Sequence, residues 1–151
     1  MSNSRQFPDR PFVGVGAVIV EGPRVLLIRR RFEPLAGEWS LPGGAVDVGE
    51  TLERCVAREM LEETGLEVSI GPVIDVFDRI TRDDDGRVRY HYVLVDYLCW
   101  PTGGALQAGS DVDAAVWVES SELGPYGLAE KTIAVIARAC ELAQKASGPT
   151  R

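Results

Sequence analysis

Short runs of apolar and β-branched residues recur along the chain, separated by clusters of residues that are typical of turns. The runs predict five strands, at residues 12–20, 25–31, 68–80, 87–99 and 114–118. The first two strands are joined by Glu-Gly-Pro and the two long ones by residues 82–86, whose sequence Arg-Asp-Asp-Asp-Gly is typical of a hairpin turn. The intervening Gly- and Pro-rich residues 33–44 are expected to form a loop.

Two segments instead show the 3.6-residue period of helices, residues 51–64 and residues 130–146. The first has well-defined ends, because Thr51 is a suitable N-cap and Gly65 is a suitable residue just beyond the last turn. Strands interleaved with two separated helices indicate the α/β class, with helices covering a mixed sheet.

No internal repeat, low-complexity block or linker divides the chain. A single domain is therefore expected over residues 11–146, between a flexible N-terminus (1–10) and a flexible tail (147–151). A chain of 151 residues can bury about two-thirds of its unfolded surface in one core. Its longest apolar stretch, residues 13–20, is far shorter than the roughly 20 residues that a membrane-spanning helix needs.

The composition adds a charge argument and a redox argument. The chain has 16 Lys and Arg against 23 Asp and Glu, a formal charge of −7, which argues against the basic face that a nucleic-acid polymer requires. Its 3 cysteines are widely spaced, and no secretory signal is evident, so we expect a reduced, cytoplasmic protein. If the ligand is a phosphate compound, a cation that the sequence does not encode must help to hold it.

The first predicted helix has an unusual distribution of acidic residues. Glu59, Glu62 and Glu63 fall within an arc of roughly 100°, on the same side as Cys55 and Val56. A solvated acidic face is the ordinary alternative, but such faces usually alternate in sign, and carboxylates at a core boundary repel one another and lose hydration. A bound Mg²⁺, which prefers carboxylate and phosphate oxygens, would resolve this conflict.

The region around this helix resembles the complete signature of the Nudix hydrolases. The matching positions are Gly44, Glu50 and then Arg58, Glu59, Met60, Leu61, Glu62, Glu63, Thr64, Gly65 and Leu66. The preceding Trp-Ser-Leu-Pro-Gly-Gly is also similar to the segment that usually leads into this signature. The remainder of the chain resembles the family only in its order of strands and helices.

The resemblance implies an α/β/α sandwich with a mixed β-sheet between helices, and hydrolysis of a nucleoside diphosphate linked to another moiety. It implies that Glu59 and Glu63 are the principal ligands of Mg²⁺, for which Mn²⁺ could substitute. Glu62 would be a further ligand or the base that acts on a metal-bound water, and the carbonyl of Gly43 often serves as another ligand.

Other positions of the signature are implied to be structural or to position the acids. Glu50 would hold the loop to the helix together with Arg58, which would also steer the catalytic carboxylates. Gly44 and Gly65 would permit the local backbone path.

The general base varies within the family, and the alternatives stay open here. Some members use a glutamate of the helix, and others use an acid on a loop before a late strand. In this sequence that loop contains Asp111, our first choice, and Asp113, our second. Both are equally explained as turn formers before a strand.

Four further residues are candidates for substrate binding. Strand alternation places Arg29 and Arg31 on one face and Arg30 on the other, and one of these faces could reach a substrate phosphate. Trp39 in the loop and Tyr126 in a later turn are candidates for contact with a base or sugar, although Trp39 is also explained as a packing anchor.

The sequence thus predicts a metal-dependent pyrophosphohydrolase whose partner is a small-molecule nucleotide, with an ADP-ribose-like substrate favoured. Water would attack one phosphorus and release a nucleoside monophosphate and a phosphorylated second product. The alternatives are a (d)NTP diphosphatase that clears damaged nucleotides and, in another class, a nucleotide-sensing module without activity. Relatives of this size are often homodimers.

Overall fold

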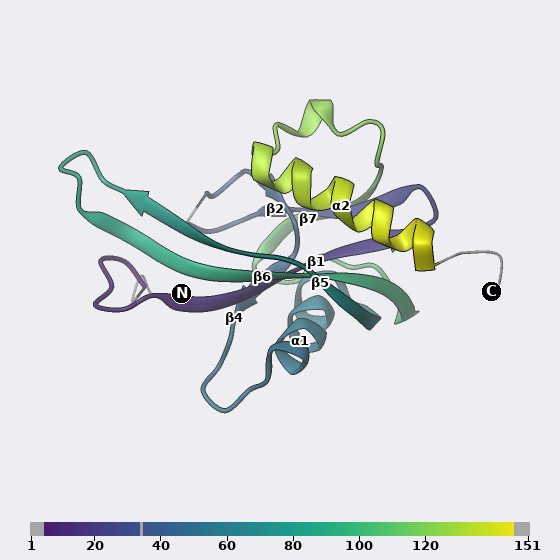
Figure 1. Ribbon diagram of the computed structural model, residues 1–151, viewed down its shortest axis with the longest axis horizontal. Coiled ribbons are helices and arrows are strands. Elements are labelled where there is room, and N and C mark those ends of the chain that lie inside the picture. The colour runs from purple at the N-terminus through teal and green to yellow at the C-terminus, as the bar shows by residue number, and fades with distance from the viewer. Residues whose placement is uncertain (1–4, 34, 147–151) are drawn as a thin grey trace.

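The computed structural model describes residues 5–33 and 35–146 (Figure 1). The strands are β1 (Phe12–Glu21), β2 (Arg24–Arg30), β3 (Trp39–Ser40), β4 (Gly43–Ala45), β5 (Leu66–Arg82), β6 (Val88–Gly104) and β7 (Val112–Glu119). The helices are α1 (Leu52–Thr64) and α2 (Glu130–Ala146), with a single 3-10 turn, η1 (Gly124–Tyr126), before α2.

The strands form a mixed sheet in the order β3-β2-β1-β6-β5, with β4 also paired to β1 and β7 to β2. β1 pairs with β2 only next to their turn, where Val20 lies opposite Val25. Beyond that point the two strands separate, and β1 pairs with β4 on one side and in parallel with β6 on the other. The segment that contains β3 and β4 therefore lies where β1 and β2 diverge.

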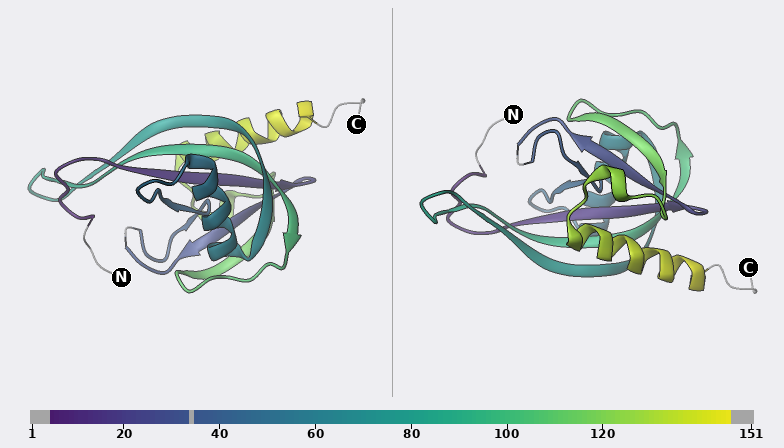
Figure 2. Two further views of the ribbon diagram at one scale, coloured as in Figure 1. Left: turned by 90° about the horizontal axis from the view of Figure 1, so that it is seen from below. Right: turned by 90° about the horizontal axis from the view of Figure 1, so that it is seen from above.

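The two helices cover opposite faces of the sheet, as the views from below and above show (Figure 2). Along β1 the side chains alternate, so Val15, Ala17 and Ile19 pack with α1, whereas Val18 and Val20 pack with α2. β6 repeats this alternation: its odd-numbered side chains at positions 95–99 join the α1 cluster, and Leu98 joins the α2 cluster.

The predicted α/β class with a mixed sheet between helices is confirmed, and both helices lie where the sequence placed them. The strands β5, β6 and β7 are longer than expected, because their pairing continues past the apolar runs. The prediction of an unbroken loop over residues 33–44 was wrong, because this segment contains β3 and the first part of β4. Residues 82–86 form the expected turn, in which Gly86 N–H donates to the carbonyl of Asp83 (3.0 Å).

The predicted flexible ends lie partly outside the described residues, which exclude 1–4 and 147–151. Within the described part of the N-terminal segment, Phe7 N–H donates to the carbonyl of Arg89 on β6 (2.8 Å). All three cysteines are free thiols. Within residues 5–33 and 35–146, neither helix has the length and apolar character needed to cross a lipid bilayer.

Candidate active site

The helix α1 has firmly defined ends. At its start the hydroxyl of Thr51 accepts a hydrogen bond from Arg54 N–H (3.1 Å). At its end Gly65 adopts φ 76°, the left-handed region that favours glycine, and its N–H donates to Leu61 C=O (3.0 Å). A Cβ at Gly65 would also collide with the carbonyl of Ala105. The local sequence therefore fixes which residues of α1 face the sheet.

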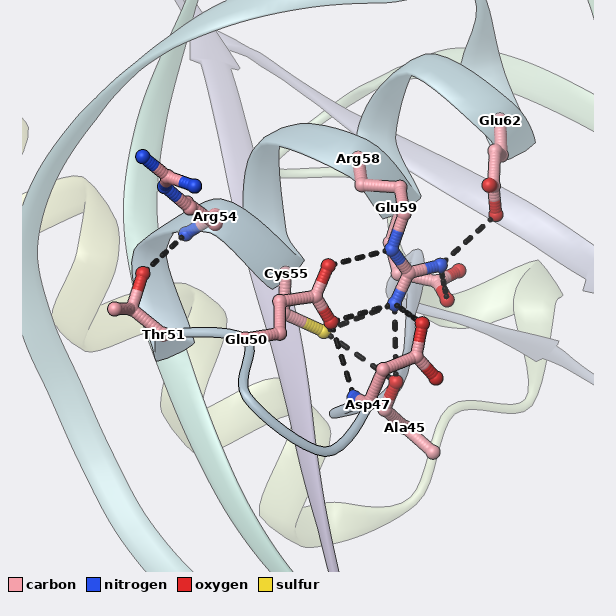
Figure 3. Close-up of polar contacts among 9 residues, drawn as sticks. All are labelled: Ala45, Asp47, Glu50, Thr51, Arg54, Cys55, Arg58, Glu59 and Glu62. Atoms are coloured by element: carbon pink, nitrogen blue, oxygen red, sulfur yellow. Dashed lines mark hydrogen bonds and ion pairs between the residues drawn. The ribbon is translucent and has the colours of Figure 1, made fainter.

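Arg58 links this helix to the loop that precedes it (Figure 3). Its Nε and Nη2 form a two-pronged contact with the carboxylate of Glu50, at 2.6 and 2.9 Å. Its Nη1 donates to Glu59 (3.0 Å) and Glu62 (3.2 Å), and Nη2 also donates to the carbonyl of Ala45 (3.2 Å). The guanidinium also lies 3.5 Å from the carboxylate of Asp47. It thus contacts four acids and a backbone carbonyl, for which its planar set of five donors is suited.

Three of the acids that Arg58 contacts have clearly different environments. Hydrogen bonding from Arg58 lowers the pKa of Glu50 to about 2, so this carboxylate is firmly ionised. Burial raises the pKa of Glu59 to about 7, although Arg58 opposes the change, and only 13% of its side chain is exposed. Glu62 is different, because 58% of its side chain is exposed. The helix thus places Glu59 at the core boundary and Glu62 in solvent.

Glu63 is the second acid at the core boundary. Its Oε1 accepts a hydrogen bond from Gly43 N–H (2.9 Å) at the start of β4. Burial raises the pKa of Glu63 to about 8, and the Gly43 N–H and the charge of Arg30 act against that rise. The neighbouring charge of Glu59 raises this pKa further. Two carboxyls with raised pKa values therefore lie side by side on α1, an arrangement that favours a bound cation.

The two glycines that begin β4 let the backbone lie directly against these acids. A Cβ at Gly44 would collide with the carboxylate of Glu59, and a Cβ at Gly43 would collide with the carbonyl of Val15 on β1. Both positions therefore require glycine for close approach, not for an unusual φ. The carboxylate of Glu59 occupies space that any other residue at position 44 would fill.

A loop before β7 brings Asp111 to the same place. Gln107 N–H donates to Thr64 C=O (2.8 Å), and Gly109 N–H donates to Glu63 C=O (3.1 Å), so the loop is tied to the end of α1. The charge of Asp111 raises the pKa of both Glu59 and Glu63. Asp113 points elsewhere and accepts a hydrogen bond from Arg31 Nε (2.8 Å). Of the two loop acids, Asp111 is the one near the helix glutamates.

The candidate substrate-binding residues separate into two groups. Arg29, Trp39 and Tyr126 form a stack from three segments: the Arg29 guanidinium lies 5.5 Å from the centre of the Trp39 ring, which meets the Tyr126 ring edge-on at 5.1 Å. Arg31 is not part of this stack, because it binds Asp113 and the carbonyl of Ser110 (3.0 Å).

The sequence left open which face of the strand reaches a phosphate and favoured Arg29 and Arg31, yet Arg30 is the strand arginine whose charge acts on Glu63. Strand alternation had placed it on the face opposite Arg29. That face is the one covered by α1, since Leu26 on the same strand packs in the α1 cluster. Strand alternation alone does not show which face of β2 is covered by α1, so the sequence could not identify Arg30 as the arginine near Glu63.

The donor set fits a hard divalent cation such as Mg²⁺ or Mn²⁺, which carboxylate and carbonyl oxygens bind. Within the described part of the chain, no three acidic, His or Cys side chains already form a cage for a metal ion. Glu59 is instead bonded to Arg58, and Glu63 to the Gly43 N–H. Small rotations of these two carboxylates would exchange N–H donors for a cation, and their raised pKa values reflect burial that a cation would offset.

Comparison with known proteins identifies the family to which the chain belongs. The NUDIX domain family matches residues 10–139. An ADP-ribose pyrophosphatase from Methanocaldococcus jannaschii is 35% identical over 113 residues, which are 75% of this chain and 64% of that protein, less than two-thirds of its length. A putative 8-oxo-dGTP diphosphatase 2 from Mycobacterium tuberculosis is 41% identical over 110 residues, 72% of this chain and 74% of that protein.

The crystal structure of a MutT NUDIX hydrolase from Burkholderia pseudomallei superposes with a TM-score of 0.75 and 35% identity. The match covers 86% of this chain and 98% of that one. The fold agrees with that of this solved structure, and the chain belongs to the Nudix family.

Proposed function

We propose that this chain hydrolyses the pyrophosphate bond of a nucleoside diphosphate linked to another moiety, with Mg²⁺ or Mn²⁺ held by Glu59 and Glu63. The observation that carries the proposal is the pair of half-buried carboxyls, with pKa values of about 7 and 8, that lies against the Gly43–Gly44 backbone. Burying such a pair opposes folding when no cation is near, and a bound cation offsets that cost. The Gly43 carbonyl and the exposed Glu62 would complete the ligand set.

When bound, the metal polarises phosphoryl oxygens and lowers the pKa of the attacking water. The chain supplies the remaining parts. Arg58 holds Glu59 in place through its Nη1, and Arg30 adds positive charge next to Glu63. Glu62 or Asp111 takes the proton of the attacking water. Glu62 is open to solvent, as a base that exchanges protons must be, whereas Asp111 is carried to the site by a loop tied to α1.

An ADP-ribose-like substrate is favoured, by analogy with the name of the archaeal relative. The name of the mycobacterial relative supports the alternative, a (d)NTP diphosphatase that acts on damaged nucleotides. In both cases the Arg29–Trp39–Tyr126 stack offers aromatic faces to a base or sugar. Arg31 would contact phosphate only after leaving Asp113, which makes it the weaker of the two arginine candidates.

We further propose that the protein acts in the cytoplasm on this small-molecule nucleotide. A homodimer would use the edge strand β5, where Val73, Val76 and Ile80 are exposed at 45%, 57% and 45%. Light scattering during size-exclusion chromatography measures the mass directly. A monomer at micromolar concentrations would overturn the dimer and leave the enzymatic proposal intact.

The test of the activity is phosphate and nucleotide release from ADP-ribose, NADH, dGTP and 8-oxo-dGTP with Mg²⁺, Mn²⁺ or a chelator. We expect hydrolysis that depends on the metal and that Glu63→Gln lowers by several orders of magnitude. The matched control is Glu53→Gln, the same change at an exposed position of α1, which should keep full activity. Unchanged turnover in Glu63→Gln would refute the assignment, and nucleotide binding without hydrolysis in the parent protein would instead identify a sensing module.

A further inference from the structure

Asp96, in the middle of β6, is a buried acid that the proposed chemistry does not use. It is 5% exposed and lies in a strand whose neighbouring positions are apolar or aromatic. Val95 and Tyr97 on either side of it pack with α1, so its side chain points to the opposite face, the one that α2 covers. Its carboxylate contributes nothing to the apolar packing of that face.

The structure shows no local partner that would explain this burial. Within residues 5–33 and 35–146, no side chain or backbone N–H donates a hydrogen bond to Asp96, and no cation lies within ion-pair distance. Lys131 of α2, one of the two cations whose charge acts on Asp96, binds Asp75 instead (2.5 Å). Burial raises the pKa of Asp96 to about 6, and the more distant charges of Arg79 and Lys131 counter this only in part, while Asp75 adds to it.

The backbone next to Asp96 is shaped around its carboxylate. Gly16 on β1 is its strand neighbour, and a Cβ at Gly16 would collide with Oδ1 of Asp96. The chain thus keeps a glycine beside an unpaired acid, although burying an acid without a partner opposes folding. Buried polar groups without partners are typical of functional sites, where a ligand supplies the missing hydrogen bonds.

Two further observations connect Asp96 to the active site. Gly43, Gly16 and Asp96 lie side by side across β4, β1 and β6, so two strand spacings, roughly 10 Å, separate the backbone at the catalytic glutamates from Asp96. The aromatic side chains of Trp39 and Tyr126 pack on the same face of the sheet as Asp96, in the cluster that α2 covers. The glutamates lie on the α1 side of the sheet, so a nucleoside whose phosphates lie there would pass the edge strand β4 to place its base on the face of Asp96.

We propose that Asp96 is a specificity-determining residue that accepts hydrogen bonds from N–H groups on the Watson–Crick edge of the substrate's purine base. This inference rests on the proposed function and names the part of the nucleotide that the site recognises. A carboxylate has two acceptor oxygens and no donor, so it requires a ligand that offers donors. Adenine offers its 6-amino group, and guanine offers a 1-imino and a 2-amino group next to each other.

The experiment removes the hydrogen bond from each side in turn. On the protein side, Asp96→Asn keeps the shape but exchanges one acceptor oxygen for a donor. On the substrate side, purine-riboside diphosphoribose replaces ADP-ribose, and dITP replaces dGTP, so that each analogue lacks one amino group. Asp78→Asn, the same change at an exposed position of β5, is the matched control. Values of kcat and KM are measured for all combinations with Mg²⁺.

In the parent protein, loss of the amino group should raise KM by tenfold to a hundredfold, the range expected for one hydrogen bond to a charged group, in the substrate pair that the enzyme uses. In Asp96→Asn, KM for the parent substrate should rise by a similar factor, whereas KM for the analogue should rise little further. The kcat values should stay within about threefold of one another in all combinations. The adenine and guanine pairs show which purine is recognised.

Two results would overturn the inference. One is that the increase in KM caused by Asp96→Asn and the increase caused by the analogue multiply when the two changes are combined. This would show that Asp96 and the amino group act independently. The other is equal KM values for substrate and analogue in the parent protein, a result that needs no folded variant. Failure of the proposed function would look different, because the parent protein would then hydrolyse none of these compounds with any metal. Calorimetric titration of AMP and GMP into the parent protein and Asp96→Asn would still show whether nucleotide binding depends on Asp96.

Discussion

The burial of Asp96 on β6 allows a quantitative prediction of how the stability of the protein depends on pH. The pKa of Asp96 is raised by burial from its ordinary 3.8 to about 6. Between pH 4 and pH 6 the folded protein therefore holds a proton that the unfolded chain has released. In this range the free energy of unfolding falls as the pH rises, and the loss is complete above pH 6. The difference between the two pKa values corresponds to about 3 kcal/mol.

Asp96→Asn removes this titration, so the variant should be more stable than the parent protein at neutral pH. The gain should be small near pH 4, grow up to pH 6 and then stay near 3 kcal/mol, as an upper limit, because the unfolded chain also retains some structure. Urea unfolding with a chelator present, followed by the fluorescence of the 3 tryptophans between pH 4 and 8, measures it.

The matched control is again Asp78→Asn, whose exposed side chain should give a small change that is the same at every pH. A difference between Asp96→Asn and the parent that does not vary with pH would refute the reasoning. So would a variant less stable than the parent at pH 7, since this would mean that the carboxylate has a stabilising partner in the folded state.

Three other changes test the site through its packing. Gly44→Ala pushes a Cβ into the carboxylate of Glu59, so metal-dependent turnover should fall at least tenfold, while circular dichroism shows an unchanged fold; full turnover would contradict the close approach. Arg58→Lys keeps the charge but loses the two-pronged contact with Glu50, so the urea midpoint should fall, and an unchanged midpoint would contradict this role of the contact. Tyr126→Ala removes one ring of the aromatic stack, and steady-state kinetics should show a higher KM with kcat retained.

The helix that carries the acids could be predicted because its signals are local. Thr51 and Gly65 mark its two ends within the sequence itself, and the structure uses both as caps. The grouping of Glu59 and Glu63 at the core boundary also follows from the helical period alone. Glu62 shows the limit of that argument, since the same arc contains a side chain that is mostly exposed.

The short strands could not be predicted in this way. β3 has two residues and β4 has three, too few to show an alternating pattern. They are strands because β2 and β1 lie beside them, and that proximity follows from the divergence of the β1–β2 pair. Composition suggested a loop, since Gly and Pro disfavour strands in general.

Individual side-chain partners were the least predictable. Arg31 meets Asp113, 82 residues later, and no local pattern connects them. Asp96 reads in the sequence as one polar position within a β run, and its burial follows only from the packing of α2 over that face. Both cases depend on contacts between elements that are distant in sequence.

The parallel pairing of β1 with β6 has a consequence for how the protein folds. Phe12 lies beside Tyr92, so the pairing closes a loop of about 80 residues, and such non-local contacts slow folding. Gly16 and Gly43 reach their final places only when this closure is complete. During synthesis on the ribosome, α1 could become helical early, but the metal site that we propose on it should form only after β6 has left the exit tunnel.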